Sequence, residues 1–338
     1  MSDSPSQHAA KMRVAAIIPC FRVKRFIVSV LEGIGDDVDK IYVVDDCCPE
    51  GTADHVEANY SDPRLTIIRH EQNKGVGGAV MSGYQQALAD DIEIMVKIDG
   101  DGQMDASLIP DLIRPITNLD ADYVKGNRFS SIYDVRSMPL IRLFGNAALS
   151  FMTKISSGYW RTFDPTNGFT ALSAVAAARL KYENISERYF FETDMFINLG
   201  GIRAVVQDFP MEAVYADEES NLKISDILLN LLGKHIKYST RRILYFYFLR
   251  DFSIASINLV FSILLGGFGT IFGLIVWYQS IATGVLTSPG TVMIAVLPII
   301  LSVQFLIAFL AQDIGSEPTA PLIRTKYDKV EAITKTRD

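Results

Sequence analysis

The sequence predicts an α/β protein with a mostly parallel, doubly wound sheet, followed by helices suited to a membrane. Over the first hundred residues, short apolar runs alternate with helical patterns, as in parallel sheets with crossover helices. Polar residues and glycines gather where the apolar runs end. Two long uncharged runs lie near the C-terminus, and the mean hydropathy of the chain is positive.

Strands and helices alternate in the first block. Pro19 is expected to end the first strand, and Thr52 is a candidate N-cap of the second helix. The strands are expected at Arg13–Ile18, Lys40–Val44, Leu65–Ile68 and Ile92–Ile98; the helices are expected at Phe26–Ile34, at Thr52–Tyr60, and from the glycine-rich stretch Asn73–Ala79 to near Leu88.

A second block, Ala121–Gln207, extends the same fold. Tyr123–Arg128 is expected as a strand and Met138–Ser156 as a helix. Asp164–Gly168 has the composition of a turn, and Phe190–Asp194 opens a further helix.

The most informative stretch is Lys-Ile-Asp-Gly-Asp-Gly-Gln at residues 97–103. Asp99 and Asp101 stand two residues apart at the carboxyl end of a buried strand, where open α/β sheets bind ligands. Two such carboxylates repel each other unless a cation lies between them. Mg²⁺ is commonly bound by one or two carboxylates and substrate phosphates, so the stretch predicts a metal–diphosphate site. The alternative is an acidic, glycine-rich turn.

Polar residues also follow the other predicted strands, at Pro19–Arg22, Asp45–Asp46 and Asn73–Gly78. Because the carboxyl ends of parallel strands share one edge of a sheet, we expect them near the metal site. Asp45 and Asp46 are candidates to accept hydrogen bonds from a ribose or a base. The glycine-rich loop opens a helix, whose N-terminus favours anions, although the loop lacks P-loop spacing and a Rossmann fingerprint would follow the first strand.

Two arginines and two further acids are candidates for the same site. Arg128 and Arg142 could bind phosphate oxygens through paired hydrogen bonds, and the alternative for each is a solvated surface ion pair. Glu192 and Asp194 stand near a helix start as candidates on the acceptor side. The alternative for these two acids is a stabilising interaction with the helix dipole.

Composition excludes several classes of function. The net charge of −7 argues against general nucleic-acid binding. Cys20, Cys47 and Cys48 lack the spacing of metal ligands, and an adjacent pair makes a poor disulfide, so we expect reduced cytosolic thiols. The polar N-terminus, Met1–Lys11, has no apolar stretch of the kind found in a signal peptide.

The chain changes character near Ser220. From Lys223 to Arg242, apolar residues recur at helical spacing and basic residues occupy the other faces. This pattern predicts an amphipathic helix on a membrane surface, and the alternative is an ordinary core-facing helix.

Two uncharged runs, Phe252–Tyr278 and Thr291–Ala311, are long enough to span a bilayer and are joined by the uncharged loop Gln279–Gly290. Basic residues flank the pair on both outer sides, so the positive-inside rule predicts a hairpin with both ends in the cytoplasm. Gly269-x-x-x-Gly273 would permit close helix packing. A metal–diphosphate site beside a bilayer suggests a polar donor and a lipid acceptor.

Taken in order, these motifs resemble family 2 glycosyltransferases of the GT-A fold, especially polyprenyl-phosphate sugar transferases such as dolichol-phosphate mannose synthases and bactoprenol glucosyltransferases. The resemblance spans Val14 to Lys223, and the hydrophobic hairpin matches beyond it. The matching segments are Val44-Asp45-Asp46, Asn73-x-Gly75-x-Gly77-x-Ala79, Asp99-x-Asp101-x-Gln103, Gly126-Asn127-Arg128, Asn167-Gly168-Phe169, Ser220-x-x-Lys223 and the juxtamembrane Tyr247-x-x-Arg250-Asp251-Phe252-Ser253.

The resemblance and the residue patterns together define the candidate site. The candidates for nucleotide-sugar binding are Pro19, Phe21, Asp45, Asp46, Lys74, Gly75, Gly77, Asp99, Gly168 and Lys223. The candidates for catalysis are Asp99, Asp101, Arg128, Arg142, Glu192 and Asp194, and those for binding Mg²⁺ or Mn²⁺ are Asp99, Asp101 and Gln103. Two segments depart from the family pattern: Pro19–Val23 lacks the usual Asn and Glu, and Cys47-Cys48 replaces Gly-Ser.

The resemblance implies inverting transfer of a sugar from a nucleotide diphosphate to a polyprenyl phosphate such as undecaprenyl phosphate. The two-helix hairpin favours UDP-glucose, with GDP-mannose as an alternative donor and a homo-oligomer expected. A processive polysaccharide synthase would carry a QxxRW motif, which is absent around Trp160 and Trp277. A non-catalytic nucleotide-binding membrane module is a further alternative.

The predicted organisation follows from these segments. It comprises residues 1–12 as a disordered N-terminus, 13–220 as a cytoplasmic GT-A domain, 221–250 as membrane-interface helices, 251–312 as two transmembrane helices, and 313–338 as a cytoplasmic tail. The protein is therefore expected in the cytoplasmic membrane, with its catalytic domain in the cytoplasm.

Overall fold

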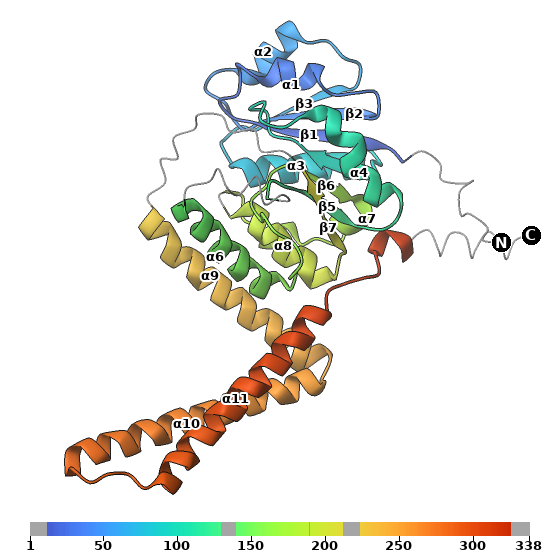
Figure 1. The fold of residues 1–338 in the computed structure, drawn as a ribbon. Helices are drawn as coiled ribbons and strands as arrows, with labels where there is room; N and C mark the ends of the chain where they lie inside the picture. Colours follow the sequence, from blue (N-terminus) through green and yellow to red (C-terminus); the bar gives the residue numbers. More distant parts are fainter. Residues whose placement is uncertain (1–11, 130–139, 189, 212–223, 326–338) are drawn as a thin grey trace, which may run out of the picture. The chain divides into compact units, whose positions relative to one another are not determined.

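The structure is a computed structural model that describes residues 12–129, 140–188, 190–211 and 224–325 (Figure 1). The chain divides into two compact units. The sheet unit comprises Met1–His235 and Pro318–Asp338, and the hairpin unit comprises Ile236–Glu317.

A seven-stranded sheet forms the centre of the sheet unit, in the order β3-β2-β1-β4-β6-β5-β7. Strand β6 pairs antiparallel with both β4 and β5, and the other pairings are parallel. The mostly parallel sheet is therefore confirmed. The strands are β1 (Val14–Cys20), β2 (Lys40–Asp45), β3 (Leu65–Arg69), β4 (Ile94–Lys97), β5 (Tyr123–Asn127), β6 (Thr170–Ser173) and β7 (Val206–Pro210).

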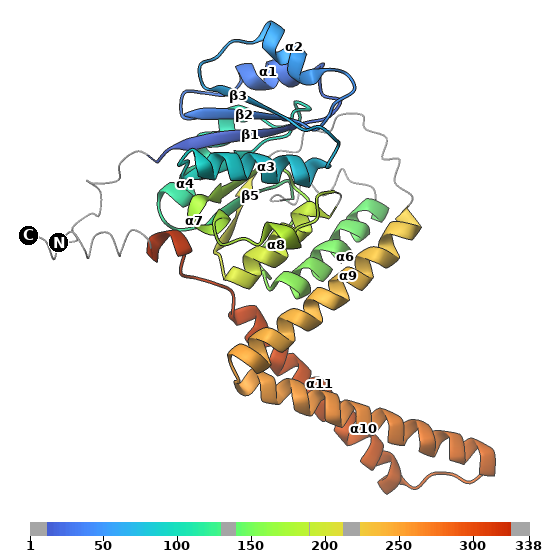
Figure 2. The same ribbon diagram turned by 180° about the vertical axis from the view of Figure 1, so that it is seen from behind.

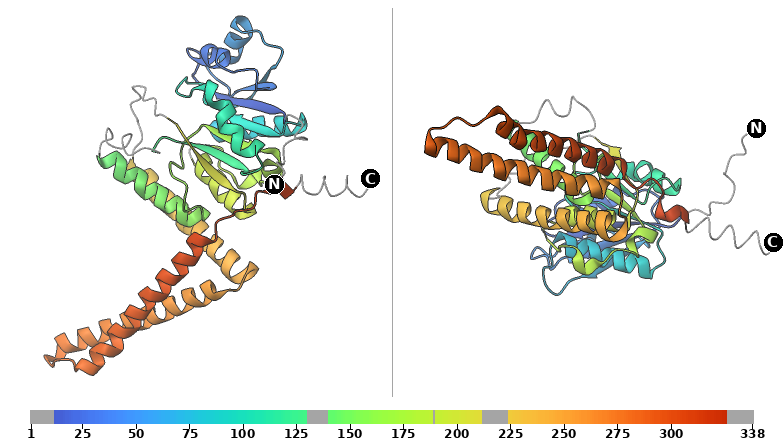
Figure 3. Two further views of the ribbon diagram at one scale, coloured as in Figure 1. Left: turned by 45° about the vertical axis from the view of Figure 1, so that its right-hand side comes forward. Right: turned by 90° about the horizontal axis from the view of Figure 1, so that it is seen from below.

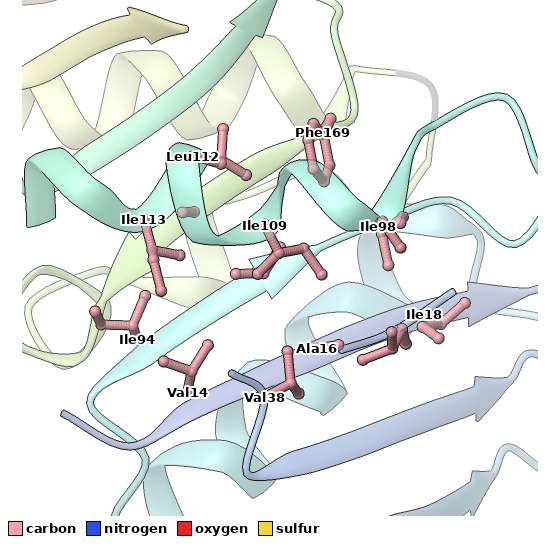
Figure 4. Packing of buried hydrophobic residues seen from close by; sticks show 14 of the residues in the cluster. Val14, Ala16, Ile18, Val38, Ile94, Ile98, Ile109, Leu112, Ile113 and Phe169 are labelled. Atoms are coloured by element: carbon pink, nitrogen blue, oxygen red, sulfur yellow. The ribbon is translucent and has the colours of Figure 1, made fainter. Parts of the chain in front are cut away.

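Helices cover both faces of the sheet (Figures 1 and 2). Alternate residues of each strand enter one of two cores, because successive side chains point to opposite faces. One core lies under α1 (Ile27–Glu32), α2 (Thr52–Asn59) and α4 (Ile109–Thr117), and the other lies under α3 (Val76–Ala89), α7 (Ala174–Ala177) and α8 (Phe191–Ile202). Figure 4 shows Ile109, Leu112 and Ile113 of α4 packed over strand residues of the first core. Short 3₁₀ turns lie at Ala106–Leu108 and Tyr182–Asn184.

Three local predictions are wrong in detail. Strand β1 continues through Pro19, which pairs with Val44 of β2. The pairing of β1 with β4 has already ended at Ile17, so the sheet tolerates the N–H that Pro19 lacks. Gly51, not Thr52, is the N-cap of α2, because the chain enters that helix through a left-handed residue with φ of 64°. Strand β4 begins at Ile94, two residues later than expected.

Two long helices complete the described sheet unit and lead out of it. Helix α6 (Leu140–Ser157) and helix α9 (Ile224–Leu244) lie side by side (Figures 1 and 2). Their contact includes a buried histidine: His235 Nδ1 lies 3.0 Å from Ser156 Oγ, and its ring packs edge-on against Phe190. His235 Nε2 has no hydrogen-bond partner among the residues that the structure describes.

Burial lowers the pKa of His235 to about 4, below its ordinary value. In the unfolded chain the imidazole takes up a proton near pH 6.5, whereas in the folded chain it stays neutral until about pH 4. Because the unfolded state binds the proton first, stability is expected to fall as the pH drops from 6.5 towards 4. Thermal unfolding across this range should show less of this loss in His235→Gln than in wild type, whereas His55→Gln should retain it. An unchanged pH slope in His235→Gln would contradict this account.

The chain returns to the sheet unit after its apolar helices. Residues 322–325 form a helical turn in which Ile323 is 2% exposed and belongs to the core under α4. The fully buried carboxylate of Asp122 accepts hydrogen bonds from the backbone N–H groups of Leu322, Ile323 and Val205, at 2.8, 2.8 and 2.9 Å. The segment that follows the hairpin is therefore part of the sheet unit.

The hairpin unit consists of two antiparallel helices, α10 (Ile254–Thr283) and α11 (Pro289–Gly315), preceded by a π-helical turn, Tyr245–Arg250 (Figure 3). Both helices are longer than predicted, and the loop between them, 284–288, is correspondingly shorter. A Cβ on Gly269 would lie 2.7 Å from Ala295 O, so the glycine pair does permit the close packing expected of it.

A buried polar cluster joins the two ends of the hairpin unit. Arg242 donates two hydrogen bonds of 2.8 Å to Asp313, and Tyr247 donates a third of 2.5 Å to the same carboxylate. Asp313 is 1% exposed, so these partners stabilise a charge that would otherwise be costly to bury.

Candidate active site

The topology brings the predicted polar segments to one edge of the sheet. Strands β1, β2, β3 and β4 run parallel, and β5 is parallel to β4 because β6 is antiparallel to both. The residues that follow all five strands therefore lie along the same carboxyl edge. This is the position at which open α/β sheets bind ligands.

The candidate metal ligands occupy a tight turn after β4. Asp101 Oδ1 accepts a hydrogen bond of 3.0 Å from the backbone N–H of Gln103, and Gly102 adopts a positive φ of 76°. The side chain of Asp99 is 29% exposed. This turn therefore presents its carboxylates at the protein surface, as a metal–diphosphate site requires.

A buried lysine lies beneath Asp99. Lys97 Nζ is 2.8 Å from Asp99 Oδ1 and 3.6 Å from Glu192 Oε1, and its side chain is 2% exposed. Burial acts to lower the pKa of Lys97, but the two carboxylates outweigh burial and raise it, so the amine remains an ammonium. Burial raises the pKa of Glu192 even though Lys97 opposes the shift.

Gly168 makes this arrangement possible. A Cβ at this position would lie 2.3 Å from Asp99 Oδ2 and 2.5 Å from Lys97 Nζ, closer than such atoms approach. The predicted site residues Asp99, Glu192 and Gly168 thus meet around Lys97, from three separate segments of the chain.

The donor groups present fit a hard divalent cation. Asp99, Asp101 and Gln103 offer two carboxylates and an amide, which are oxygen donors of the kind that Mg²⁺ and Mn²⁺ accept. Among the described residues, no group of three or more His, Cys, Asp or Glu side chains gathers as a metal cluster. The protein would therefore supply part of the coordination shell, and a diphosphate and water the rest.

The two acids at the end of β2 accept hydrogen bonds from their own chain. Asp45 accepts from the N–H groups of Cys48 and Ala53 at 2.7 and 2.9 Å. Asp46, which is 2% exposed, accepts from the N–H groups of Lys74 and Gly75 at 2.8 and 2.7 Å. The Asp45 bonds hold the turn that leads into α2, and the Asp46 bonds link the end of β2 to the glycine-rich loop.

A series of hydrogen bonds from Ser82 through His70 holds the carboxylate of Asp46. His70 Nδ1 lies 2.8 Å from Asp46 Oδ1, and His70 Nε2 lies 2.9 Å from Ser82 Oγ. The carboxylate of Asp46 also holds two backbone N–H groups, so this series of hydrogen bonds fixes the Asp46 side chain in place.

The glycine-rich loop was expected to offer its helix N-terminus to an anion. In the structure the carboxylate at the start of α3 is Asp46 of the same chain, and the N–H of Gly78 donates to Glu187 O at 3.0 Å. A Cβ on Gly75 would lie 2.6 Å from Glu187 O, and Gly75 adopts a positive φ of 90°. These glycines therefore allow α3 to pack against the segment before α8.

Arg128 lies at the carboxyl edge, as predicted, and its guanidinium binds a carboxylate of the chain. Nε and Nη2 donate to the two oxygens of Asp164 at 2.8 and 2.9 Å. Burial acts to raise the pKa of Asp164, but the Arg128 guanidinium outweighs burial and lowers it. Asn167 Nδ2 donates to the same carboxylate at 3.2 Å, so Arg128 also fixes the loop that carries Gly168.

The remaining candidates differ in their placement. Asp194 is 1% exposed and accepts hydrogen bonds from the backbone and hydroxyl groups of Ser186, so its geometry indicates a role in holding that segment. Pro19 is buried, and Phe21 is 42% exposed at the carboxyl edge. Lys223 and the side chain of Arg142 lie outside the described residues.

Sequence reasoning missed the roles of Lys97 and Asp164. The signal for Lys97 was a charged residue within the otherwise apolar stretch Ile94–Ile98, which precedes Asp99. Asp164 had a weaker signal, since it was assigned only to a turn. Its positive φ of 54° places its carboxylate beneath Arg128, and the sequence does not reveal that conformation.

Residues 15–180 match the model of glycosyl transferase family 2. The chain carries a glycosyl transferase family 2 domain. This match confirms the resemblance inferred from the motifs, and it identifies the protein as a glycosyltransferase.

Two curated relatives of this family 2 transferase have named activities. It is 29% identical over 215 residues to the UDP-N-acetylglucosamine–dolichyl-phosphate N-acetylglucosaminyltransferase of Methanococcus voltae, covering 60% of this chain and 85% of the relative. It is 26% identical over 234 residues to the undecaprenyl-phosphate mannosyltransferase of Micrococcus luteus, covering 68% and 93%.

A solved structure shares the fold. Glucosyl-3-phosphoglycerate synthase from Mycobacterium tuberculosis, crystallised with Mn²⁺, UDP and glucosyl-3-phosphoglycerate, superposes with a TM-score of 0.51 at 17% identity. The match covers 72% of this chain and 86% of that one. This confirms the GT-A-like sheet.

Proposed function

We propose that this family 2 transferase moves a sugar from a nucleotide diphosphate to a polyprenyl phosphate at a membrane, with the help of a divalent cation. The observation that carries the proposal is the partly exposed turn of Asp99 and Asp101, with Asp99 held by the buried ammonium of Lys97 at the carboxyl edge. Both relatives described above are named for transfer of a sugar to a polyprenyl or dolichyl phosphate, which supports this acceptor.

The chemistry requires charge stabilisation more than proton transfer. A phosphate oxygen of the acceptor forms a bond to the anomeric carbon, and the bond from that carbon to the nucleoside diphosphate breaks, with inversion. Mg²⁺ or Mn²⁺ held by Asp99, Asp101 and Gln103 would neutralise charge on the departing diphosphate. Because the acceptor phosphate is already anionic at neutral pH, the reaction needs no strong general base. Glu192 remains the acceptor-side candidate.

Two helices of the chain have the length and composition of membrane spans. Only 11% of the most apolar window of each helix is buried within the structure. Large apolar side chains therefore face outward along both helices, as is expected of helices in lipid. Together with the lipid-linked acceptors of the relatives, this supports membrane anchoring.

The fold supports a hairpin that crosses the membrane twice. The chain up to His235, which precedes the hairpin unit, and residues 318–325, which follow it, belong to the same sheet unit. Both flanks must therefore lie on one side of a membrane, which an even number of spans allows. The basic residues Arg241, Arg250 and Arg324 that flank the hairpin favour the cytoplasmic side.

The donor and the subunit number are finer parts of the proposal. We propose a UDP-sugar, with UDP-glucose tested first. The Methanococcus relative is named for UDP-N-acetylglucosamine, which supports uracil as the base of the donor. The Micrococcus relative is named a mannosyltransferase, so mannose is the alternative sugar. A homo-oligomer is proposed because a single hairpin offers a small anchor.

The test is a transfer assay with the purified full chain in detergent and undecaprenyl phosphate as acceptor. Parallel reactions receive UDP-glucose, UDP-N-acetylglucosamine and GDP-mannose, and mass spectrometry identifies any lipid-linked product. A product from one donor would support the proposal and identify the sugar. If no donor gave a product although nucleotide binding was measurable, the polyprenyl-phosphate acceptor would be rejected.

A further inference from the structure

Lys97 occupies a position where the alternation of β4 calls for an apolar side chain. Met95, two residues earlier on the same face, packs in the core under α3 and α8. Lys97 is equally buried there, at 2% exposed. Because a buried ammonium is costly unless it is paired and hydrogen-bonded, its partners indicate what it does.

The partners of Lys97 come from two segments distant in sequence. Asp99 follows β4, and Glu192 lies in the first turn of α8; their distances to Nζ are 2.8 and 3.6 Å. Both carboxylates are partly exposed, at 29% and 18% of the side chain. The cation therefore lies at the floor of the site, and the carboxylates that it holds face outward.

A second buried lysine shows what a purely structural arrangement looks like. Lys125 of β5 donates to the backbone carbonyls of Phe163, Asp164 and Gly126, and it lies 3.3 Å from Asp208 Oδ1. Its bonds thus hold a loop to a strand. Lys97 pairs instead with two side chains that belong to the candidate site.

The backbone at Gly168 closes the arrangement from a third side. Any side chain there would overlap both Asp99 Oδ2 and Lys97 Nζ. Asp99 therefore lies between an ammonium and a glycine backbone, which limit the space open to its carboxylate.

We propose that Lys97 is a positioning residue that holds Asp99 as a metal ligand and sets the spacing of Asp99 and Glu192 across the site. This inference rests on the proposed function. Lys97 contacts neither substrate directly in this account; it acts through the orientation of Asp99.

The test is a double-mutant cycle that measures Mn²⁺ binding to the full chain in detergent, with UDP present. Free Mn²⁺ is followed by electron paramagnetic resonance in wild type, Lys97→Met, Asp99→Asn and the double variant. Lys97→Met and Asp99→Asn are each expected to weaken Mn²⁺ binding by roughly 10- to 100-fold. The double variant should bind no more weakly than Asp99→Asn, because the two residues act as one unit.

Circular dichroism and thermal unfolding first establish that each variant folds. If Lys97→Met fails to fold, Gly168→Ala provides the second test, because it displaces the same pair without removing a charge; loss of Mn²⁺ affinity in this variant supports the proposal. The proposal would be overturned by unchanged Mn²⁺ affinity in Lys97→Met, or in Gly168→Ala where Lys97→Met does not fold. Additive losses of affinity in the double-mutant cycle would also overturn it. Absence of Mn²⁺ binding in wild type would instead overturn the proposed metal site, and with it this inference.

Discussion

Replacement of Asp101 by alanine is expected to reduce sugar transfer by about 100- to 1,000-fold, because the variant loses a carboxylate that would hold the cation against the departing diphosphate. The fold should be retained. In the structure, Asp101 Oδ1 accepts a short-range hydrogen bond from the N–H of Gln103 in the same turn. Initial rates with a saturating donor, measured beside the unfolding temperature, test both parts of this prediction.

Asp111→Ala is the matched control for that experiment. Asp111 is also an aspartate of the sheet unit, but its side chain is 47% exposed on α4 and pairs with Arg114. Exposed ion pairs of this kind contribute little to stability, so the variant should keep wild-type activity and unfolding temperature. Full activity in Asp101→Ala would remove the metal hypothesis, and equal losses in both variants would show that the effect is not specific.

Replacement of Asp122 by alanine is expected to destabilise the sheet unit by about 3 kcal/mol or more, since buried N–H groups left without an acceptor are costly. In the variant, the backbone N–H groups of Val205, Leu322 and Ile323 lose the carboxylate that accepts their hydrogen bonds. For a unit of this size the loss corresponds to a fall of roughly 6–12 °C in unfolding temperature. Near-ultraviolet circular dichroism of the full chain during heating would measure it.

Asp120→Ala is the natural comparison, because Asp120 is an exposed aspartate two residues away. Asp120→Ala should unfold at the same temperature as the wild type. Truncation after Glu317 should reproduce the Asp122 defect, because it removes Leu322 and Ile323 together. A truncated chain with unchanged stability would show that residues 318–325 do not stabilise the sheet unit.

Much of the architecture could be predicted from local patterns. Short apolar runs located the central strands, because strands such as β1, β4, β5 and β6 are buried on both faces. The order of strands and loops along the chain was enough to place Asp45, Asp99 and Arg128 at one edge of the sheet. These features depend on residues close in sequence, where spacing and turn chemistry are informative.

The partners of those residues could not be predicted, because they are distant in sequence. Asp46 was expected to face a ligand, yet it holds Lys74 and Gly75, which follow a different strand. Arg128 was expected to bind phosphate, yet Asp164 holds it bidentately. In each case the candidate side chain was placed correctly, and tertiary contacts determined which group it binds.

The C-terminal segment shows a different limit. Residues 313–338 were expected to form a cytoplasmic tail, and nothing in their composition distinguishes residues 318–325 from a polar terminus. Ile323 joins the core beside Asp122, which accepts hydrogen bonds from the start of its helical turn. A short segment stabilised by one buried carboxylate leaves no periodic signal.

The most direct test of the central claim is the transfer of a labelled sugar to undecaprenyl phosphate by the purified full chain, before and after metal removal. We predict a lipid-extractable product that disappears with EDTA and returns when excess Mg²⁺ or Mn²⁺ is added. Undiminished transfer in EDTA would contradict the assignment of Asp99, Asp101 and Gln103 as the ligands of a required cation.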